Sequence, residues 1–169
     1  MTSTAAVLRI KPDRVDVDTG LPKDAREKIA SDLGQVLGET YMLLVKTHVY
    51  HWNVVGPLFL SLHELTEAQY NDLFKASDEI AERIRALGFV TPLSFAAMAK
   101  KADIAEEKTA STAEDMVEQL VKDHESIVRS FRTIAGNAEE HGDYVTHDLL
   151  VGRMEFHEKA IWMLRAIVA

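Results

Sequence analysis

Apolar residues recur at every third or fourth position along most of this chain, which is the periodicity of helices that bury one face. The stripe of the first such segment steps by 4, 3, 4, 3 and 4 residues: Leu33, Leu37, Thr40, Leu44, Thr47 and His51. Residues 60–87, 117–134 and 150–168 repeat the pattern. No segment alternates convincingly between apolar and polar residues, as a half-buried strand would. The sequence therefore predicts an all-α protein with four long helices.

Residues that start or stop helices set the expected boundaries. Asp24 follows Pro22 and opens the first helix, which residues 53–57 end. Gly88 ends the second helix. Residues 136–142, which begin and end with Gly, form the predicted break between the last two helices.

The long connection in the middle of the chain completes the predicted architecture. Thr91 and Pro92 open a short helix through Ala99, between the second and third long helices. Four long helices with a short one midway predict an antiparallel four-helix bundle with one long crossover, which is the ferritin-like arrangement. Residues 24–169 form this domain. Residues 1–23 have no apolar stripe and contain two prolines, so we expect a flexible N-terminal tail.

Composition excludes several classes of protein. The 169 residues, 47% of them hydrophobic, suffice for one domain with a core, and no apolar run reaches the roughly 20 residues that span a bilayer. Without Cys, the chain has no disulfide and no thiolate ligand. The first twenty residues lack the apolar segment of a signal peptide, so we expect a cytoplasmic protein, with association with the nucleoid as a further option. A net charge of −8 disfavours electrostatic binding of nucleic acid to the folded body.

Four potential metal ligands lie on one side of the second predicted helix. His63 and Glu67 are four residues apart, as are Asp78 and Glu82, and such pairs stack on one helix face. Glu67 and Asp78 are separated by close to three turns, so all four side chains point within roughly 100° of one another. Imidazole and carboxylate groups suit iron, zinc or manganese. His51 is a fifth candidate, because a His on an apolar stripe needs a partner.

The two ligand pairs cannot share one ion within a straight helix. His63 and Asp78 are about 22 Å apart along the helix axis, whereas metal ligands lie roughly 2 Å from their ion. A second copy of the chain must therefore supply half of any shared site. This spacing predicts a symmetric dimer with two metal sites at its interface.

Each candidate ligand also has an ordinary structural explanation. Glu67, Asp78 and Glu82 can be surface carboxylates paired with Arg83 or Arg85, since charged residues are mostly exposed. A lone His on a stripe is more often a core residue with a hydrogen-bond partner. Two His and three carboxylates in phase favour the metal site over these explanations.

The segment HWNVVGPLFLSLHELTEAQYNDLFKASDEIAER, residues 51–83, resembles the signature of the Dps family, the small ferritin-like DNA-protection proteins of starved cells. The family pattern is HWN, a Gly four residues after the Trp, a Phe, LH, a carboxylate four residues later, and D-x-x-x-E-R. Its elements in this chain are His51-Trp52-Asn53, Gly56, Phe59, Leu62-His63, Glu67, Asp78 and Glu82-Arg83. The family often has Asp where this chain has Glu67.

The resemblance implies an iron-storing ferroxidase, a homododecamer that oxidises Fe(II) with hydrogen peroxide in preference to oxygen and keeps the ferric mineral in a hollow shell. The implied ligand set spans two subunits: His51, His63 and Glu67 from one, and Asp78 and Glu82 from the other. Zinc or manganese can occupy the same ligands as iron. Trp52 is a candidate electron donor when one iron is bound, with packing at the dimer contact as its alternative role.

The remaining histidines are weaker candidates for metal ligands. His124 and His157 lie on apolar stripes, where we expect core residues hydrogen-bonded within the bundle, and His157 is the best candidate for an additional ligand. His48, one turn before the first ligand, is a supporting or surface group. His141 and His147 flank an acidic stretch, for which we expect a surface role, with a cation pore at a three-fold axis as the alternative.

We expect weak or no DNA binding. Residues 1–23 carry four basic residues against three acidic ones, whereas counterion release needs several phosphate contacts. A helical scaffold or a DNA-condensing protein without metal is the main alternative function, but it leaves the phase of the ligands unexplained. A di-iron site within one chain needs Glu-x-x-His repeats, and no Glu in this chain precedes a His by three residues.

Overall fold

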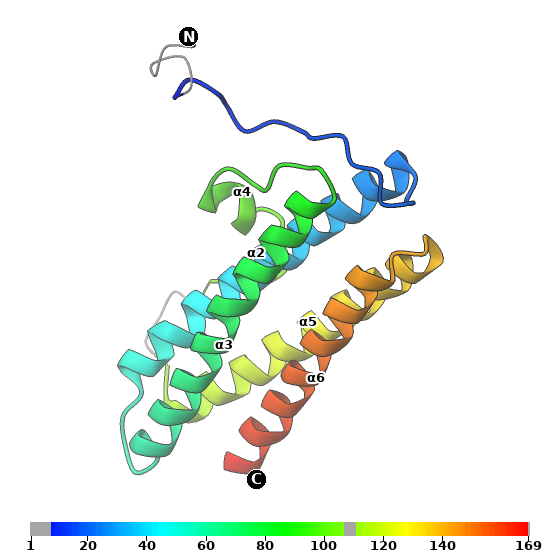
Figure 1. Ribbon diagram of the computed structural model, residues 1–169. Helices are drawn as coiled ribbons and strands as arrows, with labels where there is room; N and C mark the ends of the chain where they lie inside the picture. Colours follow the sequence, from blue (N-terminus) through cyan, green and yellow to red (C-terminus); the bar gives the residue numbers. More distant parts are fainter. Residues whose placement is uncertain (1–7, 107–110, 169) are drawn as a thin grey trace.

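The computed structural model describes residues 8–106 and 111–168, which form helices and no strand (Figure 1). The helices are α2 (Lys23–Asn53), α3 (Phe59–Ala86), α4 (Phe95–Ala99), α5 (Ala113–Glu140) and α6 (Tyr144–Ile167). The hairpins α2–α3 and α5–α6 pack together, and α4 lies in the crossover, against α2. This confirms the predicted ferritin-like four-helix bundle with a short extra helix. In the described part of the chain, no helix has the length and apolar character needed to cross a membrane.

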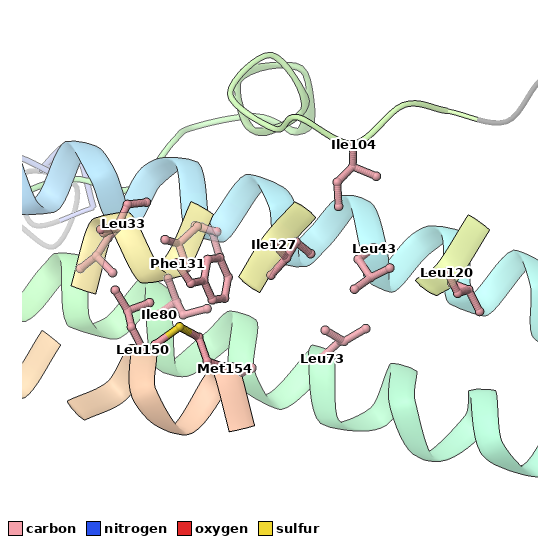
Figure 2. Close-up of a cluster of buried hydrophobic side chains, with 14 of the residues drawn as sticks. Leu33, Leu43, Leu73, Ile80, Ile104, Leu120, Ile127, Phe131, Leu150 and Met154 are labelled. Atoms are coloured by element: carbon pink, nitrogen blue, oxygen red, sulfur yellow. The ribbon is translucent and has the colours of Figure 1, made fainter. Parts of the chain in front are cut away.

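The core runs along the middle of the bundle, where the apolar stripes of the four long helices meet (Figure 2). Fully buried members include Leu33, Leu43, Leu73, Ile80, Leu120, Ile127, Phe131 and Leu150. Burying one such side chain contributes about 1.5–3 kcal/mol relative to leaving it exposed. Helix α2 contacts α3, α4 and α5, so it is buried on more than one face. Buried polar residues of α2 include Glu39 and Lys46.

Two glycines permit close contacts between backbone segments. A Cβ at Gly38 would lie 2.4 Å from the carbonyl oxygen of Met98, so the end of α4 can approach α2 only because this position has no side chain. Gly88 ends α3 with φ +93°, and a Cβ there would lie 2.3 Å from the carbonyl oxygen of Val15. The Val15 N–H donates to the Gly88 carbonyl at 2.9 Å. The segment before α2 is thereby joined to the end of α3.

The predicted tail is described from residue 8 onward. Residues 8–22 form no helix or strand, yet part of this segment contacts the bundle. Arg14 pairs with Glu27 at 3.0 Å, and its guanidinium lies 5.2 Å from the centre of the Phe89 ring. Residues 1–7 lie outside the described part, and the flexibility of the tail stays a prediction.

The turn between α5 and α6 is shorter than predicted. We expected a break over residues 136–142, but α5 continues through Gly136 for one more turn. A helix tolerates an interior Gly at a cost of about 1 kcal/mol. The stop is instead Gly142, with φ +75°, after which the Asp143 carboxylate accepts a hydrogen bond from the Thr146 N–H and caps α6.

Candidate metal centre

His51 and His63 lie together where α2 and α3 meet their connecting loop. His51 is in the last turn of α2, and His63 is near the start of α3. Gly56, with φ +103°, lets the loop between the helices stay short. The two imidazole rings stack with centroids 3.7 Å apart and planes inclined by 19°. The structure therefore brings together the two predicted imidazole ligands, His51 buried and His63 half-buried.

Each of these imidazoles is held by the backbone of the other residue. His51 Nδ1 lies 2.9 Å from the His63 carbonyl oxygen, and His63 Nδ1 lies 3.1 Å from the His51 carbonyl oxygen. A carbonyl only accepts, so each Nδ1 carries the proton and donates. Each Nε2 then keeps its lone pair, and within the described residues neither Nε2 has a hydrogen-bond partner. Both rings are thus fixed in the tautomer that binds a metal through Nε2.

The predicted carboxylate ligands are exposed on α3: Glu67, Asp78 and Glu82. Their side chains form no ion pair with the two arginines proposed as surface partners. Arg83 instead donates to Asp143 at 2.7 Å and to Thr146 at 2.9 Å. Arg85 donates to the backbone carbonyls of Asp13 and Phe89. The explanation by pairing with arginine is therefore wrong, and these carboxylates are available to a ligand from outside the subunit.

The carboxylates nearest the end of α3 lie far from the imidazoles. Helix α3 is continuous over Phe59–Ala86, so His63 and Asp78 remain about 22 Å apart. Among the described residues, no group of three or more His, Asp or Glu is arranged to hold a metal ion. The predicted imidazole ligands and these carboxylates are thus too far apart to share one ion within a single chain. Their combination across a two-fold axis stays a prediction at this point.

Comparisons with known proteins identify the family. A family model described as a ferritin-like domain matches residues 31–169. A Bacillus anthracis protein named DNA protection during starvation protein 2 is 34% identical over 142 residues, which are 84% of this chain and 97% of that protein. The chain belongs to the Dps family.

Two further comparisons give a solved Dps structure and a curated relative of higher identity. A structure of the Dps protein from Vibrio cholerae matches with a TM-score of 0.85 and 30% identity, covering 94% of this chain and 100% of that one. Its description places it in a broad superfamily of ferritin-like diiron-carboxylate proteins. A Nostoc protein named an uncharacterized low temperature-induced protein is 40% identical over 154 residues, 90% of this chain and 86% of that protein.

An aromatic stack borders the imidazoles of this Dps protein. The His48 ring lies between Trp52 and Tyr70, with centroid distances of 4.1 Å and 4.2 Å. Tyr70 also meets His51 edge-on at 5.2 Å. Trp52 is 63% exposed, so packing within its own subunit does not explain it. We did not predict Tyr70 as a neighbour, although it follows His63 by two helical turns and therefore shares its face.

His124 and His157 are core residues, as predicted. Both are 0% exposed, and their Nδ1 atoms are hydrogen-bonded to each other at 2.8 Å. Burial lowers the pKa of His124 to about 3. Burial, followed by repulsion from His124 and Arg153, also lowers the pKa of His157. This Dps protein therefore keeps a neutral imidazole pair inside its bundle. A metal-ligand role for His157 stays a prediction, and the neighbours named here, His124 and Arg153, do not add to it.

The histidines at the α5–α6 turn bind nearby backbone carbonyls. His141 Nδ1 donates to Asn137 at 2.7 Å, and His147 Nδ1 donates to Ala135 at 3.3 Å. His141 is exposed and His147 is half-buried. These contacts agree with a local surface role, and the pore at a three-fold axis stays a prediction.

Proposed function

We propose that this Dps protein binds and oxidises Fe(II) between two-fold-related subunits and stores the ferric product in a dodecameric shell. The observation that carries the proposal is the pair of imidazoles, held so that neither Nε2 has a partner in the described residues. Helix α3, which carries His63, also carries Asp78 and Glu82 about 22 Å away, and neither forms an ion pair with a described residue. A two-fold axis across α3 would bring the imidazole end of one subunit to the carboxylate end of the other.

The ligand set suits iron as a substrate. His51 and His63 would bind through Nε2, with Glu67 beside them, while Asp78 and Glu82 of the second subunit would complete the site. Two imidazoles and two or three carboxylates leave open coordination positions on the ion for water or peroxide, and the carboxylate charge favours Fe(III) over Fe(II). The longer Glu67 arm, where Asp is frequent in the family, sets the position of a second ion.

Hydrogen peroxide is the proposed oxidant because two iron ions together supply the two electrons that reduce it to water. Two Fe(II) ions each give one electron, and peroxide accepts both with two protons to form two waters. A single electron would instead release hydroxyl radical. At a site holding one iron, Trp52 and its stack with His48 and Tyr70 would supply the second electron.

Protection of DNA would then follow from the removal of Fe(II) and peroxide. Relatives carry the name DNA protection during starvation protein. We expect direct DNA binding to contribute little, because the basic residues of the N-terminal segment are few and one of them, Arg14, pairs with Glu27.

The test combines mass and oxidation kinetics. The wild type should elute with a mass near twelve chains, oxidise Fe(II) rapidly with peroxide and keep the iron soluble. The double variant His51→Ala/His63→Ala should lose the fast phase. It should still fold, because each neutral hydrogen bond lost contributes about 0.5–1.5 kcal/mol. The matched control, His141→Ala/His147→Ala, removes two histidines elsewhere and should oxidise Fe(II) at the wild-type rate.

Two outcomes would contradict the proposal. The first is an unchanged rate in His51→Ala/His63→Ala. The second is iron that precipitates in the presence of the wild type as it does in buffer, which is what a scaffold or DNA-condensing protein without a ferroxidase site would give.

A further inference from the structure

A second acidic site lies on the other buried face of α2. A pocket of about 420 Å³ lies between α2, α5 and the crossover segment, and Glu39, Asp103, Ser130 and Asn137 are among the residues that line it. Glu39 is 12 residues before His51, which places it about 18 Å along α2 from the imidazole pair. This pocket is therefore separate from the proposed iron site.

Glu39 is buried, yet only half of its carboxylate has partners. The residue is 2% exposed. Its Oε1 atom accepts from Gln35 Nε2 at 3.0 Å and from Ser130 Oγ at 3.2 Å. Its Oε2 atom is buried and has no hydrogen-bond partner of normal geometry among the described residues. A buried carboxylate oxygen without a partner lowers the stability of the folded protein. A ligand bound at Oε2 would offset that cost.

The surroundings of this oxygen favour a positively charged ligand. Burial raises the pKa of Glu39 and the nearby Asp103 carboxylate adds to the rise, whereas hydrogen bonds from Gln35, from Ser130 and from the Asp103 backbone oppose it. Asp103 is exposed and lines the same pocket. Asp32, a third acidic residue of the lining, is already used, because both of its oxygens accept from Lys28.

We propose that Glu39 and Asp103 bind a hydrated divalent cation of the Mg²⁺ class in this pocket. Magnesium keeps several waters and is commonly held by one or two carboxylates. A water occupies about 30 Å³ in the liquid, so the pocket accommodates an ion with its hydration shell. The hydroxyl of Ser130 and the amide of Asn137 can bind the ion's waters.

The ion would join three parts of the fold. Glu39 comes from α2, Ser130 and Asn137 from α5, and Asp103 from the segment that follows α4. Binding would therefore hold the crossover against the bundle. The competing source of positive charge is Arg129, an exposed residue of the lining that makes no side-chain ion pair in the described part of the chain.

The test counts bound Mn²⁺, a paramagnetic substitute for Mg²⁺, by the loss of the free-ion electron paramagnetic resonance signal on the assembled protein. Glu39→Gln keeps the side-chain shape and the contacts to Oε1, and Asp103→Asn changes an exposed residue, so both should fold. Each should bind one Mn²⁺ per chain fewer than the wild type, and Mg²⁺ should displace that same ion. Glu155→Gln, an exposed glutamate on α6 with no ion pair in the described residues, is the matched control and should bind as the wild type does.

Stability provides the second measurement. Millimolar Mg²⁺ should raise the melting temperature of the wild type and of Glu155→Gln above their values in EDTA. It should not raise that of Glu39→Gln, which in EDTA should melt higher than the wild type because the buried charge is gone. Arg129→Gln should bind Mn²⁺ more tightly, since a competing cation has been removed.

Three results would overturn the proposal: no loss of Mn²⁺ in either variant, loss in only one of the two, or weaker binding in Arg129→Gln. The pocket would then contain only water, or Arg129 would supply the charge. Peroxide-driven Fe(II) oxidation should be the same in Glu39→Gln and the wild type, so failure of this site leaves the proposed iron chemistry intact.

Discussion

Acidification from pH 7 to pH 5 should destabilise the bundle through the buried His124–His157 pair. In the unfolded chain, a His takes up a proton below its ordinary pKa of about 6.5. In the folded protein, burial and the nearby Arg153 hold the pKa of His124 at about 3. Burial, His124 and Arg153 all lower the pKa of His157. Between these values the unfolded state binds more protons, so stability falls as the pH falls.

The size of the effect follows from the pH interval. At pH 5, which is 1.5 units below the unfolded pKa, one unprotonated His costs about 2 kcal/mol at about 1.4 kcal/mol per unit. Two such groups cost at most about 4 kcal/mol per subunit. For a chain of this length, that corresponds to a fall in melting temperature of about 8–16 °C.

Scanning calorimetry on the assembled protein measures this difference. The double variant His124→Leu/His157→Leu removes both titrating groups and leaves no imidazole without its partner, so its melting temperature should change less between pH 7 and pH 5. Contributions from other groups are common to both proteins and cancel in the comparison. An equal change in the wild type and the double variant would refute the argument that burial keeps these imidazoles neutral.

Two substitutions test the packing of the fold. Gly88→Ala should lower the free energy of unfolding by about 1–2 kcal/mol or more, because alanine is disfavoured at φ +93° and its Cβ would meet the Val15 carbonyl; wild-type stability in chemical denaturation would contradict this. Lys46→Met should cost about 3–5 kcal/mol, because it leaves Asp123 buried without the ammonium that lies 2.5 Å away. Adding Asp123→Leu should recover most of that loss, and no recovery would show that the pair itself is not the cause.

Local sequence patterns were sufficient for the helices, and they supplied the list of candidate iron ligands, which stays a prediction. The stripe from Leu33 to His51 lies on a buried face, and Gly88 does end α3. Gly136 was misjudged because a glycine stops a helix only where the backbone takes a positive φ, which happens at Gly142. Sequence spacing within one helix also established the 22 Å separation of the two predicted ligand pairs, since it needs only the rise per residue.

Contacts between distant segments could not be predicted. Arg83 binds Asp143, 60 residues away, and the reciprocal Nδ1–carbonyl contacts of the imidazoles depend on how the loop closes. Glu39 was missed because the stripe analysis assumed one buried face for α2, whereas α2 packs on several neighbours. No sequence pattern distinguishes a Glu that is buried on a second helix face from a Glu that is exposed to solvent.

The central claim is that each iron site is shared between two subunits, and refolded mixtures of two inactive proteins test it most directly. One variant lacks His51 and His63, and the other lacks Asp78 and Glu82, so each homo-oligomer contains only damaged sites. When the two are unfolded, mixed in equal amounts and refolded together, random pairing across a two-fold interface should restore up to about a quarter of the sites and of the peroxide-driven Fe(II) oxidation. No recovery in shells shown by mass to be mixed would contradict the claim, because a site within one chain remains broken in every subunit.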